Sequence, residues 1–180
     1  FLLGEEDNAF SAFRIDEENQ SVQFIGSYQE SKILPSPHRS VIHPYASMAF
    51  IETGDGLIHA VRFDPSTGKM KHLSQQSIGW PGQKTIPGEM AISPGGDFLF
   101  IAVEGENRIL LNRINPDTGG LSFIKMFALD LPNPAEITPI QRMICSPEGD
   151  FLYVLIPEAK VILAFHVNPF SGNLVFRQRL

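Results

Sequence analysis

A turn of nearly constant form occurs four times in this chain and constrains the fold more than any other feature. Each copy begins with Asp or Asn after an apolar run, and the copies start at Asp16, Asp64, Asn115 and Asn168. The spacings between successive copies are 48, 51 and 53 residues. A repeat of about fifty residues whose units are made of strands is typical of folds that repeat a small β-sheet around an axis.

A second turn recurs in phase with the first. The segment 93–98, Ser-Pro-Gly-Gly-Asp-Phe, returns at 146–151 as Ser-Pro-Glu-Gly-Asp-Phe, and His43-Pro44 leads a weaker copy. Around these turns, the third unit predicts strands at 89–93, 98–103, 108–115 and 121–127, of which the second is almost continuously apolar and should be buried on both faces. The same pattern predicts strands at 48–52, 57–63 and 70–74 in the second unit and at 143–145, 151–156, 161–167 and 174–179 in the fourth. Four antiparallel strands joined by short turns form one blade of a β-propeller.

The same reading predicts an all-β chain made of one partial propeller domain. The units are 1–30, which lacks its innermost strand, and the complete blades 31–80, 81–130 and 131–180. Propellers usually have four to eight full blades, so three and a half to four blades should leave exposed flanks. We expect the remaining blades of the same protein, or a second copy, to cover those flanks. No helix of three turns is expected, because 15 Gly and 14 Pro interrupt the sequence too often.

Composition excludes two classes of partner. Lys and Arg together number 14 against 20 Asp and Glu, which argues against nucleic-acid binding. No apolar stretch approaches the roughly 20 residues of a membrane-spanning helix, so no membrane partner is expected.

Cys145, the one cysteine, lies in an apolar strand pattern and is expected to be a small buried hydrophobe, with a reactive thiol as the alternative. The compartment is left open, with the cytoplasm as the first expectation.

Turns alternate between the two ends of a meander, and this separates structural from functional candidates. The Gly, Pro and Asp turns share one end and are explained by backbone conformation and local hydrogen bonding. The other end receives the loops 5–8, 52–55, 104–107 and 157–160, which are mostly acidic. It also receives four residues that precede or open the inner strands beside the central channel: His38, Arg39, Glu89 and Arg142. We expect a site at this channel mouth.

His38 and Glu104 are the predicted acid–base residues. The imidazole of His38 could titrate in channel water, or it could cap or pack the strand that follows. Glu104 ends a buried strand, where desolvation could raise its pKa. The other loop carboxylates, Glu52 among them, are expected to be solvated surface charges, and the remaining histidines are expected to be structural. Trp80 is expected to anchor its loop or to form the rim of the mouth.

No cofactor is expected. Five scattered histidines without a close pair predict no transition-metal site, although the acidic loops leave open an oxygen-liganded divalent cation. The sequence has no nucleophile elbow, phosphate-binding Gly loop or hydrolase triad pattern. Catalysis, if present, would use proton transfer and charge stabilisation.

Segments 90–100, 107–109 and 114–121 resemble the seven-bladed lactonase-like propellers, a family that includes bacterial 6-phosphogluconolactonase-like proteins and fungal carboxymuconate cyclases. The resemblance covers essentially the whole chain and implies seven blades and a small lactone or carboxylic acid as substrate. His38 matches the catalytic histidine of the fungal pattern, and Glu104 matches its essential glutamate. Two arginines of that pattern are replaced by Gly88 and Pro157. The bacterial members resemble an Arg-His order, which is reversed here in His38-Arg39.

Two functions follow as alternatives. The first is an enzyme that hydrolyses or forms a lactone of an anionic sugar acid or muconate-type acid. In it, His38 would move protons, Glu104 would orient or balance it, and Arg39 or Arg142 would bind a carboxylate or the developing oxyanion, beside Glu89. The second is an inactive propeller whose acidic mouth binds a cationic partner or Ca²⁺.

Overall fold

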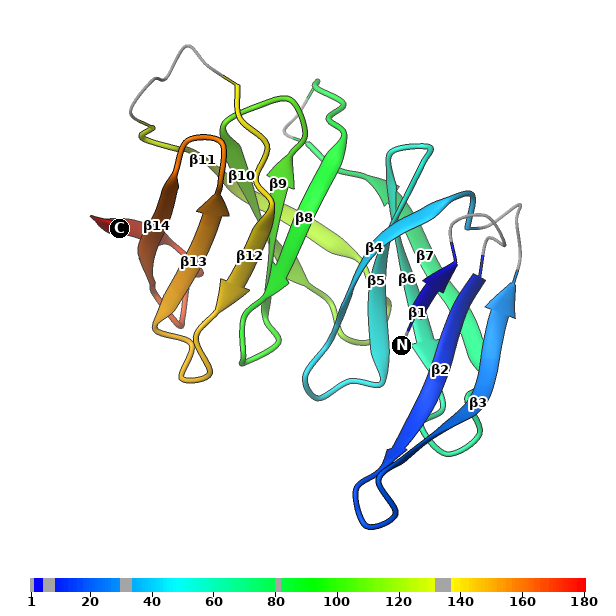
Figure 1. The fold of residues 1–180 in the computed structure, drawn as a ribbon. Helices are drawn as coiled ribbons and strands as arrows, with labels where there is room; N and C mark the ends of the chain where they lie inside the picture. The colour runs from blue at the N-terminus through cyan, green and yellow to red at the C-terminus, as the bar shows by residue number, and fades with distance from the viewer. Residues whose placement is uncertain (1, 5–8, 30–33, 80–81, 132–136) are drawn as a thin grey trace.

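The computed structural model describes residues 2–4, 9–29, 34–79, 82–131 and 137–180, which form four antiparallel sheets side by side (Figure 1). In each sheet the strands follow one another in chain order, as a meander. The first sheet has three strands, β1 (Leu2–Gly4), β2 (Ala9–Asp16) and β3 (Ser21–Gln29). The second has β4 (Pro37–Ile42), β5 (Met48–Thr53), β6 (Leu57–Phe63) and β7 (Met70–Ser77). The third has β8 (Pro87–Ile92), β9 (Phe98–Val103), β10 (Arg108–Ile114) and β11 (Leu121–Ala128), and the fourth has β12 (Arg142–Cys145), β13 (Phe151–Ile156), β14 (Val161–Val167) and β15 (Leu174–Arg179).

These sheets are the predicted blades, here called blades 1 to 4 in chain order. The inner strands β4, β8 and β12 adjoin one another, and β1 adjoins β4. Blade 1 lacks an inner strand among the described residues, as the sequence predicts. The described residues contain no helix, and therefore none that could span a membrane.

The repeated turn docks each blade onto the one before it. In blades 2, 3 and 4 the turn glycine donates its amide to the carbonyl of the opening Asp or Asn, at 2.8 Å in each case. Gly119 of blade 3 has φ +70° and lies so close to blade 2 that a Cβ on it would overlap the Cβ of Ala60. Glycine is therefore required both by a left-handed backbone and by the neighbouring blade.

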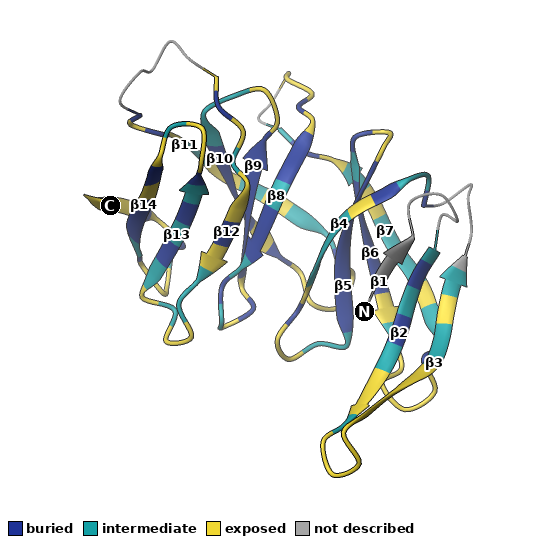
Figure 2. Ribbon diagram, viewed as in Figure 1, coloured by how far each residue is buried: buried dark blue, intermediate teal, exposed yellow. Residues whose placement is uncertain are grey.

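The core consists of apolar layers between blades. One joins blades 1 and 2 around Phe10 and Ile51, another joins blades 2 and 3 around Phe50 and Leu99, and a third joins blades 3 and 4. Strands β5 and β9 are buried at every position because another blade covers each face. In β13, which belongs to the last described blade, buried residues alternate with partly exposed ones (Figure 2).

The structure corrects several predicted boundaries. The inner strand of blade 3 begins at Pro87 rather than Glu89, and the strand beginning at Met70 runs to Ser77 rather than Ser74. His38, placed in a loop by the sequence pattern, lies inside β4, and Glu52, placed at the junction of a strand and the following loop, lies inside β5. The predictions for Trp80 and for the loop 5–8 fall outside the described residues.

Candidate functional site

Three charged residues occupy the same position in three successive blades. Arg39 pairs with Glu52 in the β4–β5 ladder, and Arg142 pairs with Leu155 in the β12–β13 ladder. Glu89 lies between the pairs that Pro87 and Met90 make with β9, and so occupies the corresponding position. Since the inner strands adjoin, equal register brings residues about fifty positions apart in the sequence together.

The side chains of these residues form a charge network across the blades. Oε1 of Glu89 lies 3.1 Å from Nη1 of Arg142, and its Oε2 lies 3.8 Å from Nε of Arg39. Arg39 also places Nη1 3.2 Å from Oε2 of Glu52. Each arginine is thus paired with at least one carboxylate, and Glu89 joins blades 2, 3 and 4.

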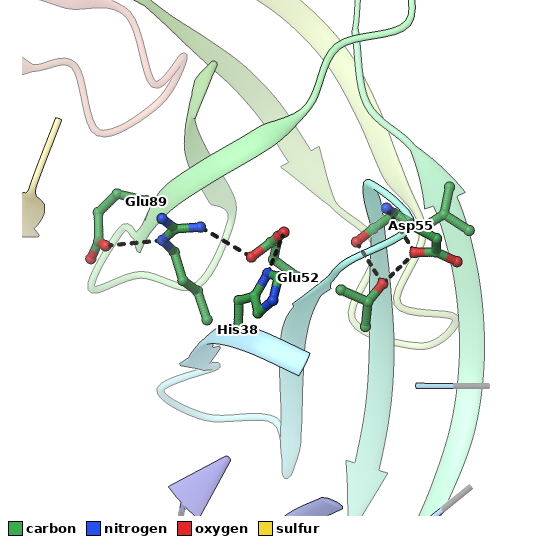
Figure 3. Close-up of polar contacts among 7 residues, drawn as sticks. His38, Glu52, Asp55 and Glu89 are labelled. Carbon is green, nitrogen blue, oxygen red and sulfur yellow. Dashed lines mark hydrogen bonds and ion pairs between the residues drawn. The ribbon is translucent and has the colours of Figure 1, made fainter. Parts of the chain in front are cut away.

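His38 enters this network through a β-bulge. Regular pairing in β4 is interrupted between Pro37 and Arg39, so that His38 is the extra residue. Its Nδ1 lies 3.6 Å from Oε1 of Glu52. Figure 3 shows Glu52 above His38, with Glu89 to the left of both, on the next blade.

The prediction that Glu52 is a solvated surface charge is wrong. Glu52 is 2% exposed, because it is the fifth residue of a strand covered on both faces. Burial raises the pKa of this carboxyl, against the opposing effects of the Arg39 and His38 charges. A sequence signal was present: the residue follows the apolar run 48–51, in phase with Ala102 of the buried strand 98–103.

Glu104 lies in the opposite environment from the one expected. It follows the last residue of β9 and is exposed, so the prediction of a desolvated carboxylate is wrong. Its backbone amide donates to the carbonyl of Ile86 at 2.9 Å, which ties the loop to the chain entering β8.

Two adjoining hollows contain the predicted site residues. One, of about 330 Å³, is lined by His38, Arg39, Glu89 and Arg142 among others. The second, of about 40 Å³, is lined by residues that include Arg39, Glu89, Glu104 and Thr138. Arg39 and Glu89 border both, so His38 and Glu104 belong to neighbouring hollows that share a wall.

Blades 2 and 3 each have a glycine at the position where the other blade has His38 or Glu104. Pro37 pairs with Thr53 as Pro87 pairs with Val103, so His38 corresponds to Gly88 and Gly54 corresponds to Glu104. A Cβ on Gly54 would lie 3.6 Å from Cε1 of His38. Blades 2 and 3 therefore each supply one of the two predicted acid–base residues opposite a glycine.

Thr138 is a polar residue that the sequence pattern did not single out. It is 4% exposed, it borders the smaller hollow, and its hydroxyl has no hydrogen-bond partner in the described part of the chain. Its amide donates to Oδ1 of Asn107 at 3.3 Å. No sequence signal pointed to it, because it lies in an irregular connection between blades.

The acidic loops hold local contacts rather than a cluster. Asp55 accepts hydrogen bonds from the hydroxyl of Thr53 and the amide of Leu57, and Glu106 pairs with Arg108 at 2.9 Å. Within the described ranges, no three His, Cys, Asp or Glu side chains come close enough to hold a metal ion. A cation at these loops stays a prediction.

The remaining titratable candidates lie away from these hollows. His43 is buried and its Nδ1 accepts from the amides of Tyr45 and Ala46. The equivalent residues in blades 3 and 4 are Ser93 and Ser146, whose hydroxyls accept from the amides of Phe98 and Phe151. Burial raises the pKa of the Cys145 thiol to about 12, as expected for a structural cysteine.

The family model described as "Lactonase, 7-bladed beta-propeller" matches residues 13–179. This chain therefore belongs to the seven-bladed β-propeller lactonase family. No curated protein matched the chain.

Solved structures share the fold at low sequence identity. A protein from Lactobacillus plantarum has a TM-score of 0.74 and 16% identity, with 98% of this chain and 52% of that chain covered. A structure from Bacteroides uniformis, named as a proposed 6-phosphogluconolactonase, has a TM-score of 0.72 and 18% identity, covering 98% and 49%. A periplasmic gluconolactonase from Pseudomonas aeruginosa has a TM-score of 0.68 and 19% identity, covering 96% and 48%. The chain spans about half the length of these structures.

Proposed function

We propose that this chain carries the acid–base part of a lactone-processing site, acting on a lactone of an anionic sugar acid or of a muconate-type acid. His38 is the proton-transfer residue, Glu104 orients the substrate, and Arg39 and Arg142 bind a carboxylate or the developing oxyanion. The observation that carries the proposal is that the hollow lined by His38, Arg39 and Arg142 adjoins the one lined by Glu104.

The chemistry needs no covalent intermediate. In hydrolysis, a water oxygen bonds to the lactone carbonyl carbon while His38 accepts the water proton. A guanidinium stabilises the oxyanion, the ring C–O bond breaks, and His38 returns the proton to the ring oxygen. Lactone and water become one hydroxy acid, and the reverse sequence closes the ring.

Arg39 and Arg142 are suited to replace the arginines that the family pattern has at positions 88 and 157. Guanidinium groups bind carboxylates through several directed hydrogen bonds and keep their charge at any working pH. The side chain of Arg142 is 70% exposed, so it can turn toward a ligand. Glu89, at 11% exposure, holds both arginines until substrate arrives.

Charge balance also favours a second candidate, a binding propeller without turnover. Glu52 and Glu89 already neutralise Arg39 and Arg142 in the absence of substrate, and the neighbouring loops are acidic. Such a surface would take a cationic partner or Ca²⁺. Calorimetry with CaCl₂ and a Lys-rich peptide would show binding if this alternative holds, and lactone turnover without such binding would exclude it.

The test compares His38→Ala and Glu104→Gln with the wild-type full-length protein on a panel of sugar-acid and muconate-type lactones, after subtraction of spontaneous hydrolysis. Loss of the general acid–base group in His38→Ala should lower kcat by about 100-fold or more. Glu104→Gln should also lower turnover, because the substrate is oriented less well for the reaction. Glu158→Gln is the matched control, because Glu158 is an exposed carboxylate in the equivalent loop of blade 4. Wild-type turnover by both site variants would refute the assignment.

A further inference from the structure

Glu52 is the buried member of the charge network, and its burial calls for an explanation. The side chains of His38 and Arg39 are 35% and 38% exposed, whereas that of Glu52 is 3% exposed. Its two carboxylate oxygens go to different partners, Oε1 to His38 and Oε2 to Arg39. One buried group thus contacts both of the ionisable side chains that β4 contributes to the larger hollow.

The fold itself does not need a carboxylate at this position. The corresponding residues are Ala102 in blade 3 and Leu155 in blade 4, both apolar. Glu52 shares a strand face with Met48 and Phe50, which pack against blade 3. Burying a carboxylate beside such side chains costs free energy that an apolar residue would not, and its raised pKa reflects that cost.

Residues kept at a cost to stability are expected where function requires them. Blade 2 is the blade that supplies His38, and it is the only one of the three complete described blades with a carboxylate at this position. The histidine and the buried carboxylate therefore occur together.

We propose that Glu52 is the positioning residue for His38 in the lactone-processing reaction, holding the imidazole through Nδ1 and holding Arg39 beside it. This rests on the proposed function. A carboxylate that accepts from Nδ1–H favours the tautomer in which Nε2 carries the lone pair and can take a proton. It also stabilises the imidazolium formed when His38 accepts that proton.

The 3.6 Å separation is that of an ion pair and is longer than a hydrogen bond. Catalytic pairs are often long without substrate and shorten when the site is occupied. Glu104 then acts on the substrate from the adjoining hollow, and the positioning role belongs to Glu52. Besides Glu52, which lies 3.6 Å from Nδ1, the hollow that His38 lines is also lined by three charged residues, Arg39 on the same strand, Glu89 on β8 and Arg142 on β12.

The experiment uses Glu52→Gln, which keeps the side-chain size and removes the charge. With the best lactone of the panel, kcat should fall by about 10-fold or more, as when the partner of a functional histidine is lost. The ascending limb of the pH–rate profile should move to lower pH, because the imidazolium loses a nearby negative charge. Arg39→Met should instead raise KM. The effect of losing the contact between Glu52 and Arg39 can therefore be told apart from the effect of losing the contact between Glu52 and His38.

Asp55→Asn is the matched control, because Asp55 lies in the turn that follows β5 and its hydrogen bonds go to Thr53 and Leu57 at the two ends of that turn. Asp55→Asn should leave the ascending limb of the pH–rate profile at the pH where wild type has it. A second readout does not require turnover: the NMR titration of the His38 Cε1 proton, assigned with His38→Ala, should move to lower pH in Glu52→Gln and stay unchanged in Asp55→Asn.

The outcomes separate the two proposals. Wild-type turnover with an unmoved limb and unmoved NMR titration in Glu52→Gln overturns the role of Glu52 and leaves the proposed function standing. Absence of wild-type turnover overturns the proposed function, and the positioning role for the reaction falls with it, even if the NMR titration still shows that Glu52 holds the imidazole. Turnover together with both shifts supports the two proposals.

Discussion

At the scale of single residues, environment separates two of the carboxylates at the candidate site. Glu52 lies inside a strand covered by blades on both faces, and Glu104 is one residue past the end of the equivalent strand and is exposed. Burial penalises the charged form of a carboxyl, so the same chemical group suits different tasks at the two positions. The buried one is fixed and the exposed one can meet a ligand.

The raised pKa of Glu52 predicts how stability depends on pH. A carboxyl whose pKa is higher in the folded chain favours folding in acid, and that contribution is lost as pH rises through the folded-state pKa. Glutamine does not titrate. Glu52→Gln should therefore gain stability relative to wild type as pH rises above the usual Glu range near 4.5, with the difference levelling off once Glu52 is fully ionised. Urea unfolding of both proteins between pH 4 and pH 8 measures this. A free energy of unfolding of Glu52→Gln that falls relative to that of wild type as pH rises would contradict the prediction.

At the scale of elements, the repeated turn acts as a joint between blades. Its opening Asp or Asn accepts from amides of the turn, as Asp64 does from Ser66 and Asn115 does from Asp117 and Thr118. These bonds shape the turn locally. The glycine that follows then fits against the preceding blade, so a local motif also fixes the spacing between sheets.

This joint predicts a contrast between two glycines with nearly the same backbone conformation. Gly119 has φ +70° and a Cβ there meets Ala60, whereas Gly56 has φ +76° and a Cβ there meets nothing within 4 Å. Gly56→Ala should cost about 1–2 kcal/mol, from the left-handed conformation alone. Gly119→Ala should cost about 2–5 kcal/mol, because overlap with the neighbouring blade is added.

Denaturant unfolding of the two variants measures this difference. Equal destabilisation by both substitutions would show that the turn does not dock blade 3 onto blade 2.

At the scale of the whole molecule, apolar side chains are exposed on both end blades. Ile15, Val22 and Phe24 of blade 1 are exposed, as is Ile162 of blade 4. Interior blades cover the corresponding positions at least in part: Phe63 and Met70 of blade 2 pack against the core between blades 1 and 2, and Ile109 of blade 3 is buried. Exposed apolar patches on sheet faces favour association, and this chain spans about half the length of the solved structures it resembles.

We therefore expect residues 1–180, expressed alone, to associate with a second copy through these flanks. Sedimentation or light scattering over a range of concentrations should show a mass above 20.0 kDa that falls on dilution. Val22→Lys with Phe24→Lys should lower it, because burying an unpaired charge opposes association. Phe170→Lys is the control, since Phe170 is exposed on a turn rather than on a flank. A constant monomer mass at all concentrations would refute the expectation.

Much of the architecture was predictable from sequence because its determinants are local. Turn residues and strand patterns repeat about every fifty positions, so the strands 98–103, 57–63, 151–156 and 161–167 were predicted with the bounds that the structure has. The family resemblance was confirmed for the same reason, since turns carry most of it. The candidate residues Arg39, Glu89 and Arg142 could also be predicted, because each lies near the start of an inner strand at the same phase of the repeat.

The sequence by itself determined the blades, their order and the end of each blade that receives the charged residues. Only the tertiary structure decided that Glu52 is buried and Glu104 exposed, and that Glu89 joins Arg39 to Arg142. A bulge in β4, the pairing of β4 with β5, and the packing of neighbouring blades set those contacts. Each depends on residues distant in sequence, so no local pattern contains it.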